Sequence, residues 1–263
     1  MSATTIGEER LRELAAELAG LLKLRSLPIG MKLFAEREAL LAVPGIRLAE
    51  DGRRFTTCQL VTNARLGGQT IGVVAESVLF FTGCASVIGL KEPDPRLASG
   101  ETMRGVWFEN QAAARAHQEE MPRVAPGRWQ GLAASPLRNG RLDPPDVVLF
   151  YANPAQMILF INGLQWRNYR RIGFSVTGET ACADSWGRAL ASREISLSIP
   201  CYAERRYGGV ADDELAMALP PEEFETGIAG LRGLDKAGLR YPILPYSTGN
   251  DPGAGLAKSY GVG

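Results

Sequence analysis

Apolar residues recur along the chain at helical spacing in some stretches and in short unbroken runs in others. Leu11, Leu14, Leu18 and Leu21 fall three and four residues apart, which predicts an amphipathic helix over residues 8–22. Strands are predicted at residues 27–34, 70–81, 129–137, 146–151, 173–176, 195–199 and 214–219. Further helices are predicted at residues 35–41, 59–66, 103–118, 154–166 and 222–234. Because strands and helices are interleaved, we expect an α/β or α+β fold, a mixed sheet with flanking helices.

The same pattern bears on domain organisation. We expect one domain over residues 1–244 and a loosely held tail, rich in Gly, Ser and Pro, over residues 245–263. Residues 58–66 and 182–190 resemble each other, since each places a cysteine before a short helical run. A strand and a second cysteine follow in both cases. This similarity suggests two similar halves, residues 23–122 and 123–234, that would bring both cysteine pairs to one cleft.

Composition narrows the class of protein. The 263 residues include 29 basic and 29 acidic side chains, so no global field would attract nucleic acid or an anionic membrane. The first residues lack a signal-peptide pattern, and no apolar run approaches the roughly 18 residues of a membrane span. We therefore expect a cytoplasmic protein whose partner is a small molecule. The oligomeric state stays open.

Four cysteines are the residues around which we organise the chemistry. Cys58, Cys84, Cys182 and Cys201 each follow or precede small residues, and Cys84 comes directly after the apolar run 78–81 and a Thr-Gly turn. In a reducing cytoplasm such cysteines are metal ligands, reactive thiols or packed core residues rather than a disulfide framework. Four thiolates can hold an iron–sulfur cluster or, alternatively, zinc. The spacing lacks the short Cys-x-x-Cys pairs that make a metal site recognisable from sequence.

Two other interpretations of the cysteines stay open. Cys84 near a helix start could be a catalytic or redox thiol, because the positive end of a helix favours the thiolate. His117 lies in a pattern typical of a solvated helix face, so Glu76 or Glu179 would have to serve as acid or base. Alternatively, all four cysteines pack as small apolar residues.

Several polar residues are candidate substrate contacts. Gln59, Asn153 and Gln156 carry amides that could bind a polar ligand, and Arg205 and Arg206 could hold a carboxylate or phosphate. Asn153 and the two arginines have a structural alternative. Asn153 before Pro154 is a typical helix N-cap, and the two arginines could form a solvated pair.

The order of these pieces, from about residue 22 to residue 234, resembles the family known as domain of unknown function 169, an uncharacterised archaeal conserved region. The segments that carry the resemblance are 27–34, Thr57-Cys58-Gln59, Ala64-Arg65, Gly83-Cys84, Gly89-Leu90, 144–148, 153–157, Cys182, Cys201 with Arg205 or Arg206, and Asp213-Glu214 ahead of Pro220. The family brings no established reaction, so the resemblance supports the choice of residues and not a chemistry. The chain departs from the expected pattern at Ile199-Pro200-Cys201, where proline replaces an expected glycine and removes a backbone donor.

The absence of several motifs argues against nucleotide hydrolysis, zinc-dependent proteolysis and α/β-hydrolase chemistry. There is no Gly-x-Gly-x-x-Gly after a strand, no phosphate-binding loop, no His-Glu-x-x-His and no Gly-x-Ser-x-Gly. The sequence therefore favours a metal- or iron–sulfur-dependent enzyme, an oxidoreductase or a lyase, acting on a small anionic molecule. The alternatives are a non-catalytic small-molecule-binding or structural protein and a thiol-dependent transferase or hydrolase.

Overall fold

The computed structural model describes residues 6–48, 56–77 and 82–244, and in these ranges seven strands form one open mixed sheet. The sheet order is β2-β3-β4-β1-β5-β7-β6. The strands are β1 (Ile29–Phe34), β2 (Arg47–Leu48), β3 (Ile71–Val74), β4 (Gly131–Pro136), β5 (Val147–Ala152), β6 (Ser196–Ser198) and β7 (Leu215–Leu219). Strands β2 and β3 are parallel and every other pair is antiparallel. The fold is therefore α+β, within the predicted class.

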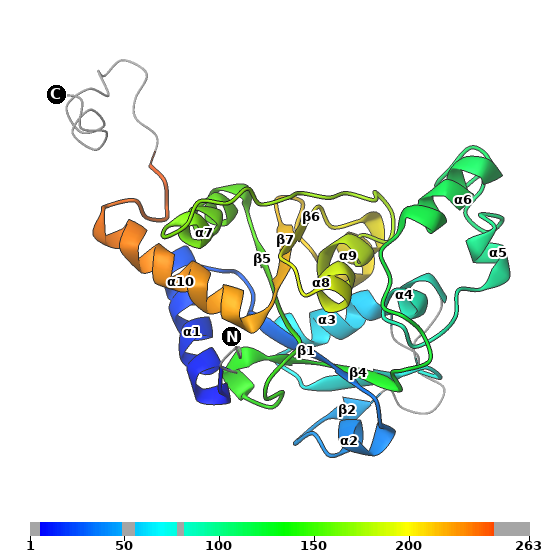
Figure 1. The fold of residues 1–263 in the computed structure, drawn as a ribbon, viewed down its shortest axis with the longest axis horizontal. Coiled ribbons are helices and arrows are strands. Elements are labelled where there is room, and N and C mark those ends of the chain that lie inside the picture. Colours follow the sequence, from blue (N-terminus) through cyan, green and yellow to red (C-terminus); the bar gives the residue numbers. More distant parts are fainter. Residues whose placement is uncertain (1–5, 49–55, 78–81, 245–263) are drawn as a thin grey trace.

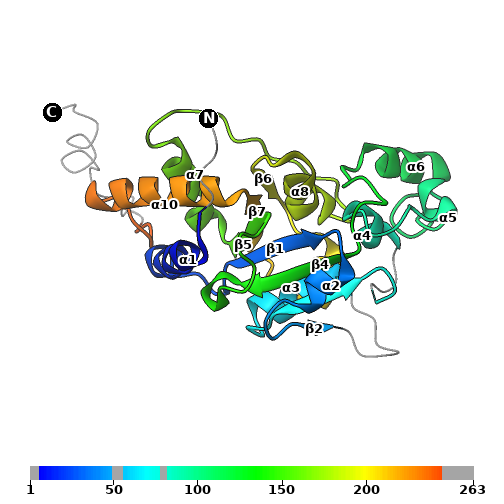
Figure 2. The ribbon, with the colours of Figure 1, turned by 60° about the horizontal axis from the view of Figure 1, so that its bottom comes forward.

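Helices cover both faces of this sheet (Figure 1). The α-helices are α1 (Glu8–Leu22), α2 (Arg37–Leu41), α3 (Thr57–Arg65), α4 (Thr82–Val87), α5 (Pro95–Ala98), α6 (Gln111–Glu120), α7 (Pro154–Gln165), α8 (Arg188–Ser192), α9 (Tyr202–Gly208) and α10 (Pro221–Lys236). A 3-10 turn, η1 (Leu137–Asn139), and a π-helical turn, η2 (Ala183–Gly187), complete the described elements. Helices α5 and α6 lie at the end of the molecule opposite to α1, α7 and α10 in both views (Figures 1 and 2).

Alternation along β5 separates two apolar cores. Val148 and Phe150 point to one face, where they pack with buried residues of α1, α7 and α10. Val147, Leu149 and Tyr151 point to the other face, where they pack with buried residues of α3, α4 and η2. Since side chains of a strand alternate between faces, an unbroken apolar run is the pattern of a strand covered on both sides.

Helices α7 and α10 of the first face approach each other closely. Gly163 of α7 lies against α10, and a side chain at Gly163 or Gly230 would overlap backbone atoms of the partner helix. Phe150 and Phe160 pack edge to face at 4.9 Å between ring centroids in the same core. This face is thus a dense structural layer, and the candidate chemistry lies on the other one.

Most predicted elements are present, with three differences. The helix predicted at 103–118 begins only at Gln111, capped by Asn110, and residues 173–176 form no strand. The strand predicted at 70–81 is observed as Ile71–Val74, while 78–81 and the tail from 245 lie outside the described residues. Asn153 caps α7 as expected, with Pro154 at its first position.

The predicted boundary between two halves does not interrupt the sheet. Strand β1 of the first half pairs with both β4 and β5 of the second. The internal duplication stays a prediction. Within the described ranges, no helix combines the length and the apolar composition that crossing a membrane requires.

Candidate functional site

All four cysteines line a single cavity of about 310 Å³ on the second face of the sheet. Cys58 comes from α3, Cys84 from α4, Cys182 from the residue before η2 and Cys201 from the residue before α9. Residues separated by up to 143 positions (201 minus 58) are thereby brought together. The fold, and not one short loop, supplies the site.

Helix starts position two of these cysteines. Thr56 and Gln59 form a reciprocal capping box at the start of α3, which holds Cys58 in the first turn. Cys201 is the N-cap of α9, and its backbone N–H donates to the Glu204 carboxylate at 3.1 Å. In both cases the cysteine lies within the first turn, where backbone N–H groups lack helical partners.

Cys84 and Cys182 contact each other in this cavity, and their Sγ atoms are 3.9 Å apart. The Cys182 thiol donates to the Cys84 sulfur, and this hydrogen bond lowers the pKa of Cys84 below its ordinary 9.0. The same contact, together with burial, raises the pKa of Cys182 well above its ordinary value. Cys84 is the half-exposed member of the pair, and Cys182 is buried. In the absence of a metal, Cys84 is the thiol best prepared to lose its proton.

The other two thiols are held in the neutral form. Burial raises the pKa of Cys58 far above its ordinary value and the pKa of Cys201 to about 12. Cys84 and Cys201 add electrostatic repulsion to the Cys58 thiolate. Several thiolates in one cavity therefore require a compensating positive charge, which a bound metal would supply.

The remaining lining of the cavity is mainly apolar. Beside the cysteines, its larger side chains are those of Leu97, Met103, Val106, Trp107, Tyr202 and Tyr207. The rings of Trp107 and Tyr202 lie 5.5 Å apart between centroids. Trp107 and Tyr202 are 42% and 54% exposed, so these aromatics form part of the mouth of the cavity.

Glu179 is the one carboxylate among the described residues that line this cavity. It is half-buried, and burial raises its pKa above the ordinary 4.5. The Nε2 atom of His117 lies 3.0 Å from the Glu179 carbonyl oxygen. His117 was expected on a solvated face. It is half-buried instead, because α6 packs against the segment that leads to Cys182.

A buried charged network lies behind the cysteines. Glu204 is 3% exposed and accepts hydrogen bonds from the Tyr151 hydroxyl at 3.2 Å and from the backbone of Cys201. Burial raises the pKa of Glu204 and of Tyr151. The Arg65 guanidinium stacks on the Tyr151 ring at 4.3 Å and pairs with buried Glu214 at 3.3 Å. This network joins β5 to α3 and α9, the two helices at whose starts Cys58 and Cys201 lie.

The predicted amide contacts lie elsewhere and serve the backbone. The Gln59 Oε1 atom accepts from the Thr56 N–H at 3.0 Å within the capping box. Asn153 and Gln156 form the equivalent box of α7, and the Gln156 Nε2 group donates to the Leu22 carbonyl at 2.7 Å. None of the three lines the cysteine cavity. Asn153 thus caps a helix, as its structural alternative predicted, and Gln59 and Gln156 complete the capping boxes of α3 and α7.

The other predicted site residues, Glu76, Arg205 and Arg206, also lie outside the lining of the cysteine cavity. Glu76 is 77% exposed in its side chain and lies 3.9 Å from Arg37, outside the cavity lining. Arg205 donates to the Ala211 carbonyl at 2.6 Å. Arg206 lies 6.0 Å from the Tyr202 ring centroid and 5.9 Å from that of Tyr207, beside the mouth. Of the predicted acid, base and substrate residues, Glu179 lines the cavity, and Arg206 lies beside Tyr202 and Tyr207, which line it.

Sequence reasoning missed the aromatic mouth and the buried network. Met103 and Trp107 fall in a region that was predicted as helix and given no role at the site. Glu204 could have been found, because Cys201-x-x-Glu204 has the spacing of a capping box. Nothing in a single sequence indicated that Arg65 would be buried.

The arrangement of the four cysteines can be compared with what a zinc ion and an iron–sulfur cluster require. Within the described ranges, no three His, Cys, Asp or Glu side chains converge tightly enough for a single metal ion. A preformed zinc site is thus not observed. Four thiols around a cavity of about 310 Å³ match the ligand type and number of an iron–sulfur cluster, a larger group than a single ion. Cys58, Cys84, Cys182 and Cys201 would hold such a cluster.

Comparison with known proteins agrees with the resemblance found in the sequence. The profile of domain of unknown function 169, described as an uncharacterised ArCR, matches residues 17–230. An uncharacterized protein of Methanocaldococcus jannaschii is 22% identical over 217 residues, which are 82% of this chain and 91% of that protein. No solved structure matches the chain. Since the profile covers most of its length, the chain belongs to the family of domain of unknown function 169.

Proposed function

We propose that this protein binds an iron–sulfur cluster through Cys58, Cys84, Cys182 and Cys201 and uses it in an enzyme reaction on a small anionic molecule. The observation that carries the proposal is the convergence of all four cysteines on one cavity. No Cys-x-x-Cys loop forces them together, and three helices, α3, α4 and α9, and the turn η2 are needed to assemble the set.

The surroundings of the cavity support this function. An apolar lining limits the access of water, which protects a cluster and strengthens electrostatic interactions inside the site. When bound, the cluster supplies redox or Lewis-acid chemistry. Trp107 and Tyr202 would cover the apolar part of the substrate. Glu179, whose pKa is raised by burial, would hold or accept a proton, and Arg206 would attract the anionic group.

The test is metal and sulfide content, with a visible spectrum, on protein purified without oxygen. We expect a brown protein with iron and acid-labile sulfide in equal amounts. A variant with all four cysteines changed to serine should be colourless, while a variant of Glu76, Glu76→Gln, should keep its iron. One zinc per chain, or a colourless wild-type protein with no metal, would overturn the cluster proposal.

The contact between Cys84 and Cys182 favours a second candidate, thiol–disulfide chemistry. The Cys84 thiolate would attack a small disulfide and release one thiolate. Cys182 would then lose its proton and attack the mixed disulfide, closing a Cys84–Cys182 bond and releasing the second thiolate. This reaction needs only two cysteines. Metal-free Cys58→Ser and Cys201→Ser variants that retain full disulfide-reducing activity would favour it over the cluster enzyme.

A further inference from the structure

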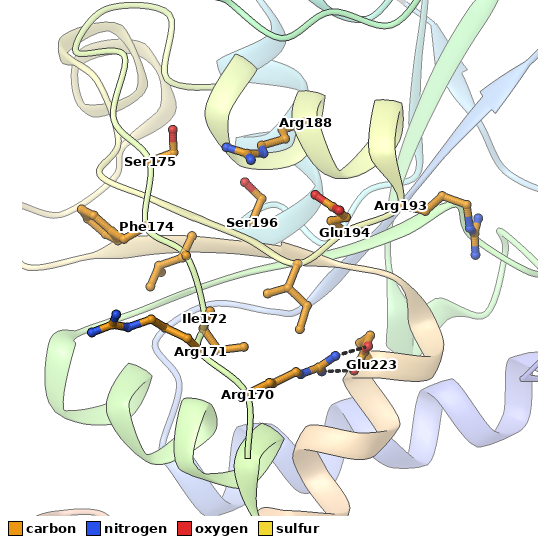
Figure 3. Close-up of a pocket in the computed structure, with 13 residues that line it drawn as sticks. Arg170, Arg171, Ile172, Phe174, Ser175, Arg188, Arg193, Glu194, Ser196 and Glu223 are labelled. Carbon is orange, nitrogen blue, oxygen red and sulfur yellow. Dashed lines mark hydrogen bonds and ion pairs between the residues drawn. The ribbon is translucent and has the colours of Figure 1, made fainter. Parts of the chain in front are cut away.

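A second cavity, of about 520 Å³, lies between the segment 170–175, the edge strand β6 and helix α8 (Figure 3). It shares no lining residue with the cysteine cavity. One backbone hydrogen bond, from the Ser175 N–H to the Leu197 carbonyl at 3.1 Å, ties the segment to β6. The cavity is thus a separate site built on the last strand of the sheet.

Most of the charged side chains that line this second cavity are arginines. Its lining contains four of them, Arg170, Arg171, Arg188 and Arg193, against two glutamates, Glu194 and Glu223. Arg170 forms a two-pronged ion pair with Glu223, and Arg193 pairs with Glu222 at 3.2 Å. Across residues 6–48, 56–77 and 82–244, neither Arg171 nor Arg188 is paired with a carboxylate. Among the described residues, the lining therefore holds two unpaired cations, Arg171 and Arg188, and one unpaired carboxylate, Glu194, which leaves an excess of positive charge.

Arg188 is the stronger of the two as an anion contact. Arg188 is half-buried and no carboxylate of the described residues pairs with it, whereas Arg171 is exposed. In Figure 3 the Arg188 guanidinium extends toward the side of the cavity on which Ser175 lies, and the Ser175 hydroxyl makes no hydrogen bond to another described residue. An anion between them would receive donors from both side chains.

We propose that this cavity binds a phosphate monoester, with the phosphate held by Arg188 and Ser175. A phosphate offers several oxygens to the guanidinium of Arg188 and the hydroxyl of Ser175, and Arg171 adds positive charge that offsets the Glu194 carboxylate. The organic part would lie on the apolar portion of the lining, formed by Ile172, Phe174, Ile195 and Leu197. The volume falls in the range of small-molecule sites, about 300–1,000 Å³. The inference is independent of the cluster at the cysteine site.

The test is calorimetric titration with three phosphate monoesters, AMP, flavin mononucleotide and glucose 6-phosphate, each beside its dephosphorylated counterpart. We expect at least one ester to bind, its counterpart to bind more than roughly tenfold more weakly, and affinity to fall as salt is raised. Arg188→Gln should weaken binding by roughly tenfold or more, and Ser175→Ala should weaken it less. Arg138→Gln, an exposed arginine outside the cavity, should bind as the wild type does.

The experiment distinguishes a loss of binding from a loss of folding. Melting temperatures establish that each variant is folded, and Arg171→Gln, at an exposed position, provides a second charge deletion that should also weaken binding. The proposal is overturned if no ester binds, if ester and counterpart bind equally, or if folded Arg188→Gln and Arg171→Gln bind as tightly as Arg138→Gln. None of these results depends on the metal content of the protein.

Discussion

The sulfur atoms of Cys84 and Cys182 lie 3.9 Å apart, although 98 positions separate the two residues in the sequence. One thiol donates to the other, so the pKa of Cys84 falls while that of Cys182 rises. Cys58 and Cys201, in the same cavity, are kept neutral by burial. The four cysteines thus share one cavity without being chemically equivalent.

These differences in pKa predict the order in which the cysteines of the metal-free protein are alkylated. Iodoacetamide should modify Cys84 first, with a rate that reaches its half-maximum below pH 9.0, because the thiolate is the nucleophile. Cys201, whose pKa is raised to about 12, should stay unreactive at neutral pH. Peptide mapping by mass spectrometry as a function of pH measures both.

A matched pair of variants identifies the cause. Cys182→Ala removes the donor, so the pKa of Cys84 should rise and its alkylation at neutral pH should slow. Cys201→Ala removes a cavity cysteine that makes no such bond, and should leave the rate unchanged. Equal alkylation of Cys58 and Cys84 in the folded wild type would contradict the geometry.

The buried ion pair between Arg65 and Glu214 offers a test of what anchors the site. Glu214→Gln leaves the Arg65 charge without its partner in a buried position, since the two side chains are 1% and 4% exposed. We expect a loss of about 3–5 kcal/mol in the free energy of unfolding. The neighbouring Asp213 pairs with Arg25 on the surface, so Asp213→Asn should have little measurable effect. Chemical denaturation of both variants measures the difference, and equal stabilities would contradict the role of the network.

Glu204 should make the stability of the metal-free protein depend on pH. Burial raises the folded-state pKa of this carboxyl above the ordinary 4.5, so the folded protein holds a proton that the unfolded chain releases. Stability should therefore fall as pH rises from about 4.5 towards the folded pKa. Glu204→Gln removes this contribution, and its stability relative to the wild type should increase over that interval. Denaturation curves at several pH values test this, and a constant difference between the proteins would contradict it.

Local patterns carried enough information to predict much of the fold. The leucine spacing of residues 11–21 predicted α1, and Asn153-Pro154 predicted the start of α7. Residues 103–110 were misassigned to a helix because their apolar residues resemble a helical face. There Met103 and Trp107 line the cysteine cavity instead. Such contacts depend on α4, α6 and α9 meeting in space, which a single sequence does not encode locally.

The candidate site was predictable in its residue type and not in its geometry. Cysteines in small-residue settings indicated a shared role, and the structure places all four at one cavity. The amides of Gln59 and Gln156 satisfy helix N-termini, a local use that competes with ligand binding. Arg188 falls within the repeated segment 182–190, but its lack of an ionic partner among the described residues is a tertiary property that the sequence does not show.

The most direct measurement of the central claim is anaerobic reconstitution of the metal-free protein with iron and sulfide, followed by desalting and iron analysis. Wild type and the four single Cys→Ser variants would be compared, with Glu76→Gln as the control. Shared ligation predicts that each cysteine variant retains less iron than the wild type, while the control retains it all. If the wild type retains no iron, or if two or more cysteine variants retain as much as the wild type, the four-cysteine cluster site is contradicted.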